Sequence, residues 1–362
     1  MTQPPKLILD AHLDLAMNAM EFNRDQRWTL ERIRRRELAT DDNLPGRARN
    51  TVCFPEMRRG RIGLCVATQI ARSVDYFSRM PGWHSPEQAW AHTQGQLAYY
   101  RAMEDLGELR SIRTARELDA HAALWLGDAP ADAPIGYVLS LEGADSILSW
   151  RHLEKSHADG LRALGPVHYG PGIYGHGTDS TGPLTLRGHE LLHAMERLGL
   201  ILDVTHLCDE SFADALAHFS GPVWASHSNC RALANWNRQF TDDQIKILIE
   251  RGAVIGMAFD AIMMVHGWAH RRSQPADFDL KIARICEHID HICQLAGNAR
   301  HVGLGSDLDG GFGTEQTPLD LDSIADLATI APLLAARGYA PADIDGIMHA
   351  NFLRFLREHL PA

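Results

Sequence analysis

The sequence predicts a (β/α)8 barrel, and three observations point to that fold. Eight short, nearly continuous apolar runs recur along 362 residues, each bounded by glycine, proline or polar residues. This pattern is typical of strands that are buried on both faces of a parallel sheet. Helical patterns often separate the runs, and eight strand–helix units fit within one domain of this length. Finally, six of the eight runs end in a side chain that can bind a metal or transfer a proton. A doubly wound sheet is the alternative, but active sites lie at the carboxyl ends of barrel strands, which favours the barrel.

The predicted elements follow one another in a regular order. The strands are expected at 7–12, 63–71, 136–144, 163–170, 200–207, 222–228, 253–259 and 301–310. Helices are expected at 86–105, 187–199, 209–219, 241–251, 281–296 and 341–358. Asp209 and Thr241 are predicted N-terminal caps, and Pro341 suits a first helical turn. We expect a single domain over 1–362, with a helical elaboration at about 72–134, because that segment is long for one crossover between the second and third strands.

Composition and charge exclude several classes of protein. The net charge of −11, from 46 acidic and 35 basic residues, argues against nucleic acid or an anionic membrane as partner. No apolar run approaches the ~18 residues that span a bilayer, and we expect no signal peptide and no membrane anchor. The six cysteines form no C-x-x-C pair, which favours free thiols. The sequence therefore predicts a cytoplasmic protein.

Five strand-end residues have the types and spacing of a metal centre. His12 and Asp14 are two residues apart, so extended backbone directs both side chains to one side. His206 and His227 end neighbouring strands, and Glu142 has two carboxylate oxygens with which to join two ions. Histidine and carboxylate ligands of this kind suit Zn2+.

Two further strand ends carry His168 and Asp307. Asp307 would join Asp14 and Glu142 as a third carboxylate at the same mouth, where the three would repel one another. Two divalent cations would offset that charge. A lone histidine at a strand end is usually a packing residue, but the pattern across six strand ends favours one joint metal site.

Several stretches resemble the membrane (renal) dipeptidase family, peptidase family M19, a branch of the metal-dependent amidohydrolase superfamily. The matching stretches are DAHLDLA, SLEGAD, LILDVTHL, WASHSNCRAL followed by NRQFTDDQ, and VGLGSDLDG, in family order from residue 10 to 310. The resemblance implies a (β/α)8 barrel with two Zn2+ ions and a hydroxide that bridges them and attacks the amide bond of a dipeptide.

The resemblance also implies a role for each matching residue. One zinc would be bound by His12, Asp14 and Glu142, and the other by Glu142, His206 and His227. His168 would polarise the substrate carbonyl, Arg238 would bind the substrate carboxylate, and Asp307 would carry the proton. The implied partner is a small dipeptide, and a homodimer is one assembly that the resemblance leaves open.

The sequence departs from the family around the substrate. Leu13 and Ala16 replace the usual asparagine and proline near the first histidine, and Ala258-Phe259-Asp260 replaces Asn-Phe-Tyr. The stretch HYGPGIYGHGTD, from His168 onward, is unusually rich in glycine. These departures keep open another reaction on the same barrel, namely hydrolysis of a lactone or cyclic amide, or deamination.

Two other functions were weighed against the barrel enzyme. His189, Glu190 and His193 fit the H-E-x-x-H pattern of a zincin protease. On a helical wheel, however, the apolar side chains of 187–199 gather opposite these histidines, so both would face away from the core. A non-enzymatic binding protein is the third hypothesis, and the presence of every metal-capable residue argues against it.

Overall fold

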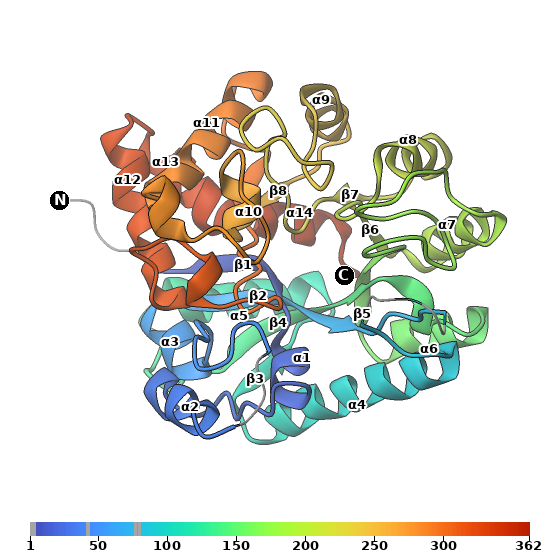
Figure 1. The fold of residues 1–362 in the computed structure, drawn as a ribbon, viewed down its shortest axis with the longest axis horizontal. Helices are drawn as coiled ribbons and strands as arrows, with labels where there is room; N and C mark the ends of the chain where they lie inside the picture. Colours follow the sequence, from blue (N-terminus) through green and yellow to red (C-terminus); the bar gives the residue numbers. More distant parts are fainter. Residues whose placement is uncertain (1–4, 41–43, 76–77, 79–80) are drawn as a thin grey trace.

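The computed structural model describes residues 5–40, 44–75, 78 and 81–362, and its centre is a parallel barrel (Figure 1). The strands follow the order β7-β6-β5-β4-β2-β1-β9-β8. They are β1 Ile8–Leu13, β2 Ile62–Ile70, β4 Ile135–Glu142, β5 Leu161–Gly165, β6 Ile201–Asp203, β7 Val223–Trp224, β8 Ile255–Met257 and β9 Val302–Leu304. A parallel bridge between Ala225 and Ile255 connects the two ends of this order. The eight strands predicted from the sequence are all present, and the barrel is confirmed.

Helices surround the barrel and connect its strands (Figure 1). They are α1 Leu15–Met20, α2 Leu30–Glu37, α3 Phe54–Arg59, α4 Pro86–Asp105, α5 Ala115–Leu126, α6 Trp150–Ala158, α7 Leu186–Leu198, α8 Asp209–His218, α9 Asp242–Glu250, α10 Ala261–Met264, α11 Ile285–Ala296, α12 Ile330–Ala336, α13 Pro341–Asp345 and α14 Asn351–His359. None of the helices in the described part of the chain combines the length and apolar character needed to cross a membrane.

The helix ends test the predicted caps. Thr241 caps α9 as predicted, since its hydroxyl accepts from the Gln244 backbone N–H while the Gln244 side chain accepts from the Thr241 N–H. Pro341 is the first residue of α13. The prediction for α8 was wrong, because Cys208 is the N-cap residue and Asp209 already belongs to the helix. The Asp209 carboxylate instead forms an ion pair with Arg231, at 2.7 Å.

Between β2 and β4 the chain forms α4, a short strand β3 (Leu109–Ser111) and α5. The sequence pattern did not predict β3, because a strand of three residues with one buried side chain contains no apolar run. β3 pairs with the first part of β4, through Leu109 and Ile135, whereas β5 pairs with its second part, through Glu142 and Gly165. The extra strand thus fills the position beside β4 at the end of the barrel opposite Glu142.

Two glycines let the strands that carry the site approach one another. A Cβ on Gly256 would lie 1.9 Å from the Ser226 carbonyl oxygen, and a Cβ on Gly305 would lie 1.8 Å from it. Real Cβ atoms do not approach an oxygen so closely, so only glycine fits at either position. The close packing holds the segment after β7, and with it His227, against β8 and β9.

Candidate active site

The structure brings the five predicted metal ligands together at the carboxyl end of the barrel. His12 lies in β1 and Asp14 directly after it, Glu142 is the last residue of β4, and His206 and His227 follow β6 and β7. All five side chains are buried. Neighbouring parallel strands end at the same edge, which is why residues far apart in the sequence meet here.

Glu142 lies at the centre of this cluster. Its Oε2 is 3.6 Å from His12 Nε2, and its Oε1 is 2.9 Å from His206 Nε2 and 3.4 Å from His227 Nε2. Three groups of possible ligand atoms at the mouth each fit within 4.8 Å: His12/His227/Asp307, and the two groups that share Glu142, namely His12/Asp14/Glu142 and Glu142/His206/His227. Because Glu142 belongs to two of these groups and its two oxygens face different histidines, its carboxylate can bridge two ions.

The donor atoms suit divalent cations. His12 Nε2 and Glu142 Oε1 are buried without a hydrogen-bond partner, although buried polar atoms in proteins rarely lack one. Hydroxyl groups contact the other ring nitrogens: Thr178 Oγ1 lies 3.0 Å from His206 Nδ1, and Ser226 Oγ lies 2.8 Å from His227 Nδ1. Contacts of this kind orient the Nε2 atoms of metal-binding histidines toward the ion.

Burial and mutual charge change the pKa values at the site. Burial opposes protonation of His12, but the facing carboxylates, first Glu142 and then Asp14 and Asp307, raise its pKa to about 10. Burial, with the nearby Arg238 guanidinium, lowers the pKa of His206 to about 3. The carboxylates therefore create a field that favours positive charge, while His206 stays neutral, the form in which histidine binds a metal.

Asp307 lies on the same mouth, with Oδ1 3.9 Å from His12 Nε2. Burial raises its pKa well above the usual range of a carboxylate, and the charges of Asp14 and Glu142 raise it further, against the effect of His12. Asp307 and His206 both have left-handed backbone, with φ of 56° and 71°. Non-glycine residues rarely adopt this conformation, and it concentrates at functional sites.

Arg238 reaches the cluster from the segment between β7 and α9. Its guanidinium donates to Ser228 Oγ at 2.7 Å and to the His227 carbonyl oxygen at 2.8 Å, and Nη2 lies 3.3 Å from His206 Nε2. Among the described residues no carboxylate lies within ion-pair distance of it. This buried cation is consequently available to an anionic group of a ligand.

Sequence reasoning missed Arg72, which follows directly after β2. Its Nη2 contacts His168 Nδ1 closely, and Nη1 donates to the Pro81 carbonyl oxygen at 2.9 Å. His168 Nε2 faces Glu142 Oε1 at 3.8 Å. The position of Arg72 at a strand end was the available signal, but the expected metal chemistry directed attention to histidine and carboxylate residues.

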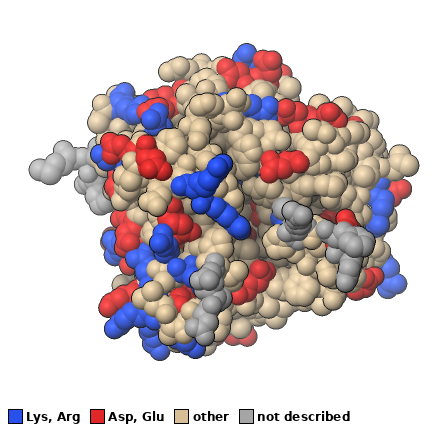
Figure 2. All heavy atoms as spheres, viewed as in Figure 1, with Lys and Arg blue, Asp and Glu red and all other residues tan. Residues whose placement is uncertain are grey.

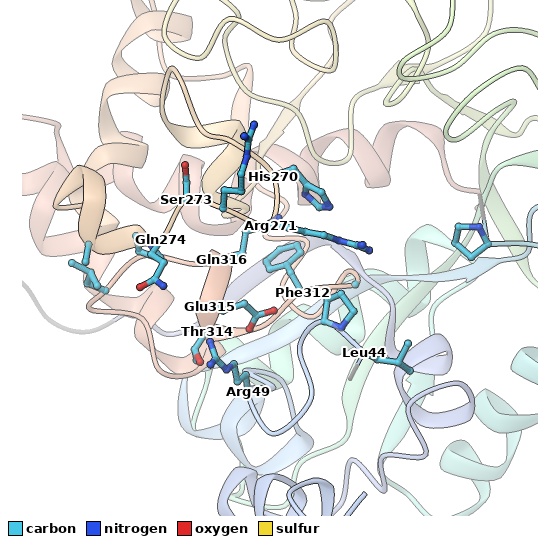
Figure 3. Close-up of a pocket in the computed structure, with 17 residues that line it drawn as sticks. Leu44, Arg49, His270, Arg271, Ser273, Gln274, Phe312, Thr314, Glu315 and Gln316 are labelled. Atoms are coloured by element: carbon cyan, nitrogen blue, oxygen red, sulfur yellow. The ribbon is translucent and has the colours of Figure 1, made fainter. Parts of the chain in front are cut away.

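A cavity of about 370 Å³ joins these residues. It is lined by Asp14, Glu142, His168, His206, Arg238 and Asp307, together with Arg72, Trp83 and Tyr169. A larger outer cavity of about 960 Å³ shares Pro81 and Gly311 with it. In the outer cavity His270 and Arg271 lie on one side and Arg49 and Glu315 on the other (Figure 3). Blue Lys and Arg side chains lie beside a hollow on this face of the molecule (Figure 2). The inner cavity has the volume of a small-molecule site.

Among the substituted positions, Asp260 is the one with a titratable side chain. Its Oδ1 accepts a hydrogen bond from Gln316 Nε2 at 2.8 Å, and burial raises its pKa to about 7. Its charge acts on Arg238 and on Asp307. Leu13 and Ala16 are fully buried.

The H-E-x-x-H residues do not meet the cluster. They lie on α7, whose Leu191, Leu192 and Met195 are buried, while the His193 side chain is 63% exposed. His189 is only half-buried and pairs with Asp214 rather than with His193. No candidate metal group among the described residues contains Glu190 or His193. The geometry therefore gives no zincin site.

The barrel and its histidine–carboxylate mouth define a class, the metal-dependent hydrolases. The model of the membrane dipeptidase family, peptidase family M19, matches residues 3–360, and the chain belongs to that family. The hydrolase expected from the motifs is therefore confirmed.

Several relatives resemble the chain over much of its length. A protein named dipeptidase aclJ, from Aspergillus oryzae, is 32% identical over 96% of this chain and 77% of its own. An uncharacterized protein in the pqqA 5′ region of Klebsiella pneumoniae is 33% identical over 62% of this chain and 83% of its own. For other curated relatives the matched stretch falls to 39% of the relative.

Solved structures share the fold. A metallopeptidase from Rhodobacter sphaeroides, described as liganded with a phosphinate mimic of the dipeptide L-Ala-D-Ala, has a TM-score of 0.78 at 23% identity. The likeness covers 98% of this chain and 99% of that one. A dipeptidase of family M19 has a TM-score of 0.79 at 24% identity, with the same coverage.

Proposed function

We propose that the chain hydrolyses the amide bond of small dipeptides with two Zn2+ ions. His12, Asp14 and Glu142 would hold one ion, and Glu142, His206 and His227 the other. The observation that carries this proposal is the central position of Glu142, whose two oxygens face histidines from opposite sides of the barrel mouth. When bound, the ions would polarise the amide carbonyl and lower the pKa of a bridging water toward 7, which supplies the hydroxide.

His168 would donate a hydrogen bond to the amide carbonyl oxygen. A guanidinium has only donors, so the contact from Arg72 requires His168 Nδ1 to accept. Burial lowers the pKa of His168, and the neighbouring His206 lowers it further, so the ring is neutral. The remaining proton therefore sits on Nε2, the nitrogen that faces Glu142 and the cavity. Arg72 acts here as a positioning residue.

Asp307 and Arg238 would complete the reaction. Burial raises the pKa of Asp307, which makes its carboxylate form a stronger base; this suits a group that takes a proton from the attacking water and then, as the acid, passes it to the leaving amine. Arg238 would pair with the terminal carboxylate of the substrate, because its guanidinium faces the cavity without a carboxylate partner of its own. An anchored carboxylate would favour dipeptides over longer chains.

A metal count paired with a substrate screen tests the proposal. The purified protein should hold two zinc ions at the barrel mouth and hydrolyse members of L-X-L-X and L-X-D-X dipeptide libraries. His227→Ala should lose metal and activity, whereas the matched control His193→Ala should keep both. Hydrolysis of lactones or cyclic amides without dipeptide cleavage would overturn the substrate class. A zinc content of His227→Ala equal to that of wild type would overturn the ligand set.

The cytoplasmic location and the homodimer stay predictions from the sequence. The six cysteines are free in the structure, which is consistent with a reducing compartment.

A further inference from the structure

We propose a separate metal site on the outside of the barrel, formed by His189 of α7 with Asp214 and His218 of α8. The two helices lie side by side in the outer ring (Figure 1). This site shares no residue with the barrel mouth, and it does not depend on the proposed function. It would take a transition-metal dication, Zn2+ above all, and tie the two helices together.

The three side chains already form one compact group. Asp214 Oδ2 lies 2.9 Å from His189 Nε2, and Asp214 Oδ1 lies 3.0 Å from His218 Nδ1. The two imidazole rings stack, with centroids 4.5 Å apart and planes inclined by 23°. One possible ligand atom from each residue lies within 4.8 Å of the other two. Two histidines thus flank one carboxylate, whose two oxygens each face a different ring.

These distances are close to those of a coordinated ion. Bonds of 2.0–2.1 Å in a tetrahedral zinc site place neighbouring ligand atoms about 3.3 Å apart. The two histidine–carboxylate contacts would each have to lengthen by only about 0.4 Å to reach that separation. His218 Nδ1 also lies 2.9 Å from the Asp214 backbone carbonyl oxygen, a contact that an ion would have to replace.

The local structure holds the carboxylate in place. Asp214 and His218 are four residues apart on α8, a spacing that brings side chains to the same helix face. The Leu184 backbone N–H, just before α7, donates to Asp214 Oδ2 at 3.0 Å. At known metal sites, hydrogen bonds to the ligand side chains hold those ligands in the orientation that binding needs, and the Leu184 N–H would do the same for Asp214.

The exposure of the group leaves room for further ligands. The exposed fraction is 17% for the Asp214 side chain, 31% for His189 and 48% for His218. Water can therefore complete the coordination of an ion bound by three protein ligands. Imidazole and carboxylate together favour Zn2+, Cu2+ and Ni2+ over Mg2+ or Ca2+. His189 is also the first histidine of H-E-x-x-H, but its neighbours in space come from α8 rather than from its own motif.

The test counts zinc at equilibrium, by titration against a chromophoric chelator. Wild-type protein should bind one more equivalent than His218→Ala, while His193→Ala, the matched control, should bind as much as wild type. Added zinc should raise the Tm of wild type by more than that of His218→Ala. Dipeptide hydrolysis should be equal in all three proteins, because none of these residues lies at the mouth.

Equal zinc counts in wild type and His218→Ala would contradict the proposed metal site and show that the three residues only pair with one another. Loss of an equivalent in His193→Ala would overturn it as well, in favour of the motif residues. Asp214→Asn, which can keep the hydrogen bond from Leu184, provides a second variant and should lose the same equivalent. Because the comparison counts a difference of one ion, it remains valid whatever number the barrel mouth binds.

Discussion

Single atoms at the barrel mouth decide what each side chain can do. His206 Nε2 lies 2.9 Å from Glu142 Oε1 and 3.3 Å from Arg238 Nη2, so with an ion bound between it and Glu142 that nitrogen would carry the lone pair and Nδ1–H would face Thr178. His168 has the opposite tautomer, because Arg72 donates to its Nδ1. One histidine is thereby prepared to bind a metal and the other to donate a hydrogen bond. The fold thus controls the chemistry of the cavity down to the position of single protons on neighbouring histidines.

Replacing Asp307 by Asn should separate metal binding from proton transfer. The five ligands stay intact, so the zinc content should equal that of wild type. Dipeptide hydrolysis should fall by about 10²- to 10⁴-fold, the usual contribution of a positioned acid–base group. The measurement is kcat together with elemental zinc. Wild-type rates in Asp307→Asn would remove Asp307 from the proton path.

Arg72→Met should lower kcat by about tenfold or more, because His168 would lose the contact that fixes its tautomer. The positioning role predicts that the effect disappears in a His168→Ala background, as a double-mutant cycle measures. Arg72→Lys should recover part of the rate, since lysine keeps one donor near Nδ1. An equal loss in both backgrounds would show that Arg72 acts on the substrate or on folding, and not through His168.

Buried His288, which lies outside the active site, should make the stability of the folded protein depend on pH. Its Nδ1 accepts from the Cys230 N–H at 3.2 Å and its Nε2 lies 3.1 Å from the Met264 carbonyl oxygen, and burial lowers its pKa to about 4. In the unfolded chain His288 binds a proton near pH 6.5, whereas in the folded protein it does so only near pH 4. The contribution of neutral His288 to the free energy of unfolding is therefore fully present above pH 6.5. It is lost as the pH falls, by about 3 kcal/mol in total.

Chemical denaturation of wild type and His288→Gln at pH 7.5, 6 and 5 measures this contribution. The stability difference between the two proteins should shrink as the pH falls, because glutamine takes up no proton. A difference that stays constant across this range would show that His288 takes up protons equally in the folded and unfolded protein, so that folding does not lower its pKa.

At the level of residues, the strand-end pattern was enough to predict which ligand atoms meet. His12, Glu142 and His227 come from the carboxyl ends of β1, β4 and β7, which are not adjacent strands but converge on the same mouth of the barrel. The contact of Arg72 with His168 and the contacts of Ser226 and Thr178 could not be predicted, because they depend on side-chain directions after the strands end. A sequence pattern fixes the position of a residue along a strand but not the direction of a loop side chain.

At the level of elements, strands with continuous apolar runs were predictable and weakly marked ones were not. β2 and β4 are buried over nearly their whole length. β3 has one buried residue of three and was not predicted. The helix expected at 341–358 contains a π-helical turn at Gly346–Ala350, which an apolar stripe does not reveal. Local hydrogen-bond choices of this sort depend on tertiary contacts that the sequence pattern does not contain.

Gly305→Ala tests how closely the strands must pack to form the site. The added Cβ would meet the Ser226 carbonyl oxygen at 1.8 Å, so β9 and the segment before His227 must separate. We expect a loss of about 3 kcal/mol or more in the free energy of unfolding, in the upper range for overpacking. Zinc affinity should fall with it, because His227 would move from Glu142.

Gly107→Ala is the matched control for that substitution. Gly107 has a φ of +75° but nothing lies within 4 Å of its added Cβ, so only the cost of left-handed backbone, about 1–2 kcal/mol, is expected. Zinc affinity should be unchanged. Similar zinc affinities in Gly305→Ala and Gly107→Ala would contradict the link between strand packing and the ligand cluster.

For the whole molecule, the barrel closes through contacts between the two ends of the chain. β1 pairs with both β2 and β9, so strands from residues 8–13 and 302–304 are neighbours. The candidate ligands come from strand ends spread from His12 to His227. An ion bound by all of them would connect segments that meet only in the folded state, and its binding free energy would add to the stability of the whole barrel.

Removal of zinc should therefore destabilise the entire protein rather than one loop. A ligand present at 100 times its dissociation constant adds about 2.7 kcal/mol to the stability of the folded state, which corresponds to a rise in Tm of several degrees. Chelation should lower the Tm in a single cooperative transition, and restored zinc should reverse the change. The experiment is best performed in His218→Ala, where the outer site proposed on α7 and α8 makes no contribution. The same chelation of a His206→Ala/His218→Ala double variant, which lacks one proposed ligand of the ion that Glu142, His206 and His227 would share, should lower the Tm by less. Loss of His206 removes the ligand that connects β6 to the rest of the mouth, so metal binding should stabilise that variant less. If chelation lowers the Tm equally in both proteins, the stabilising ion is bound elsewhere.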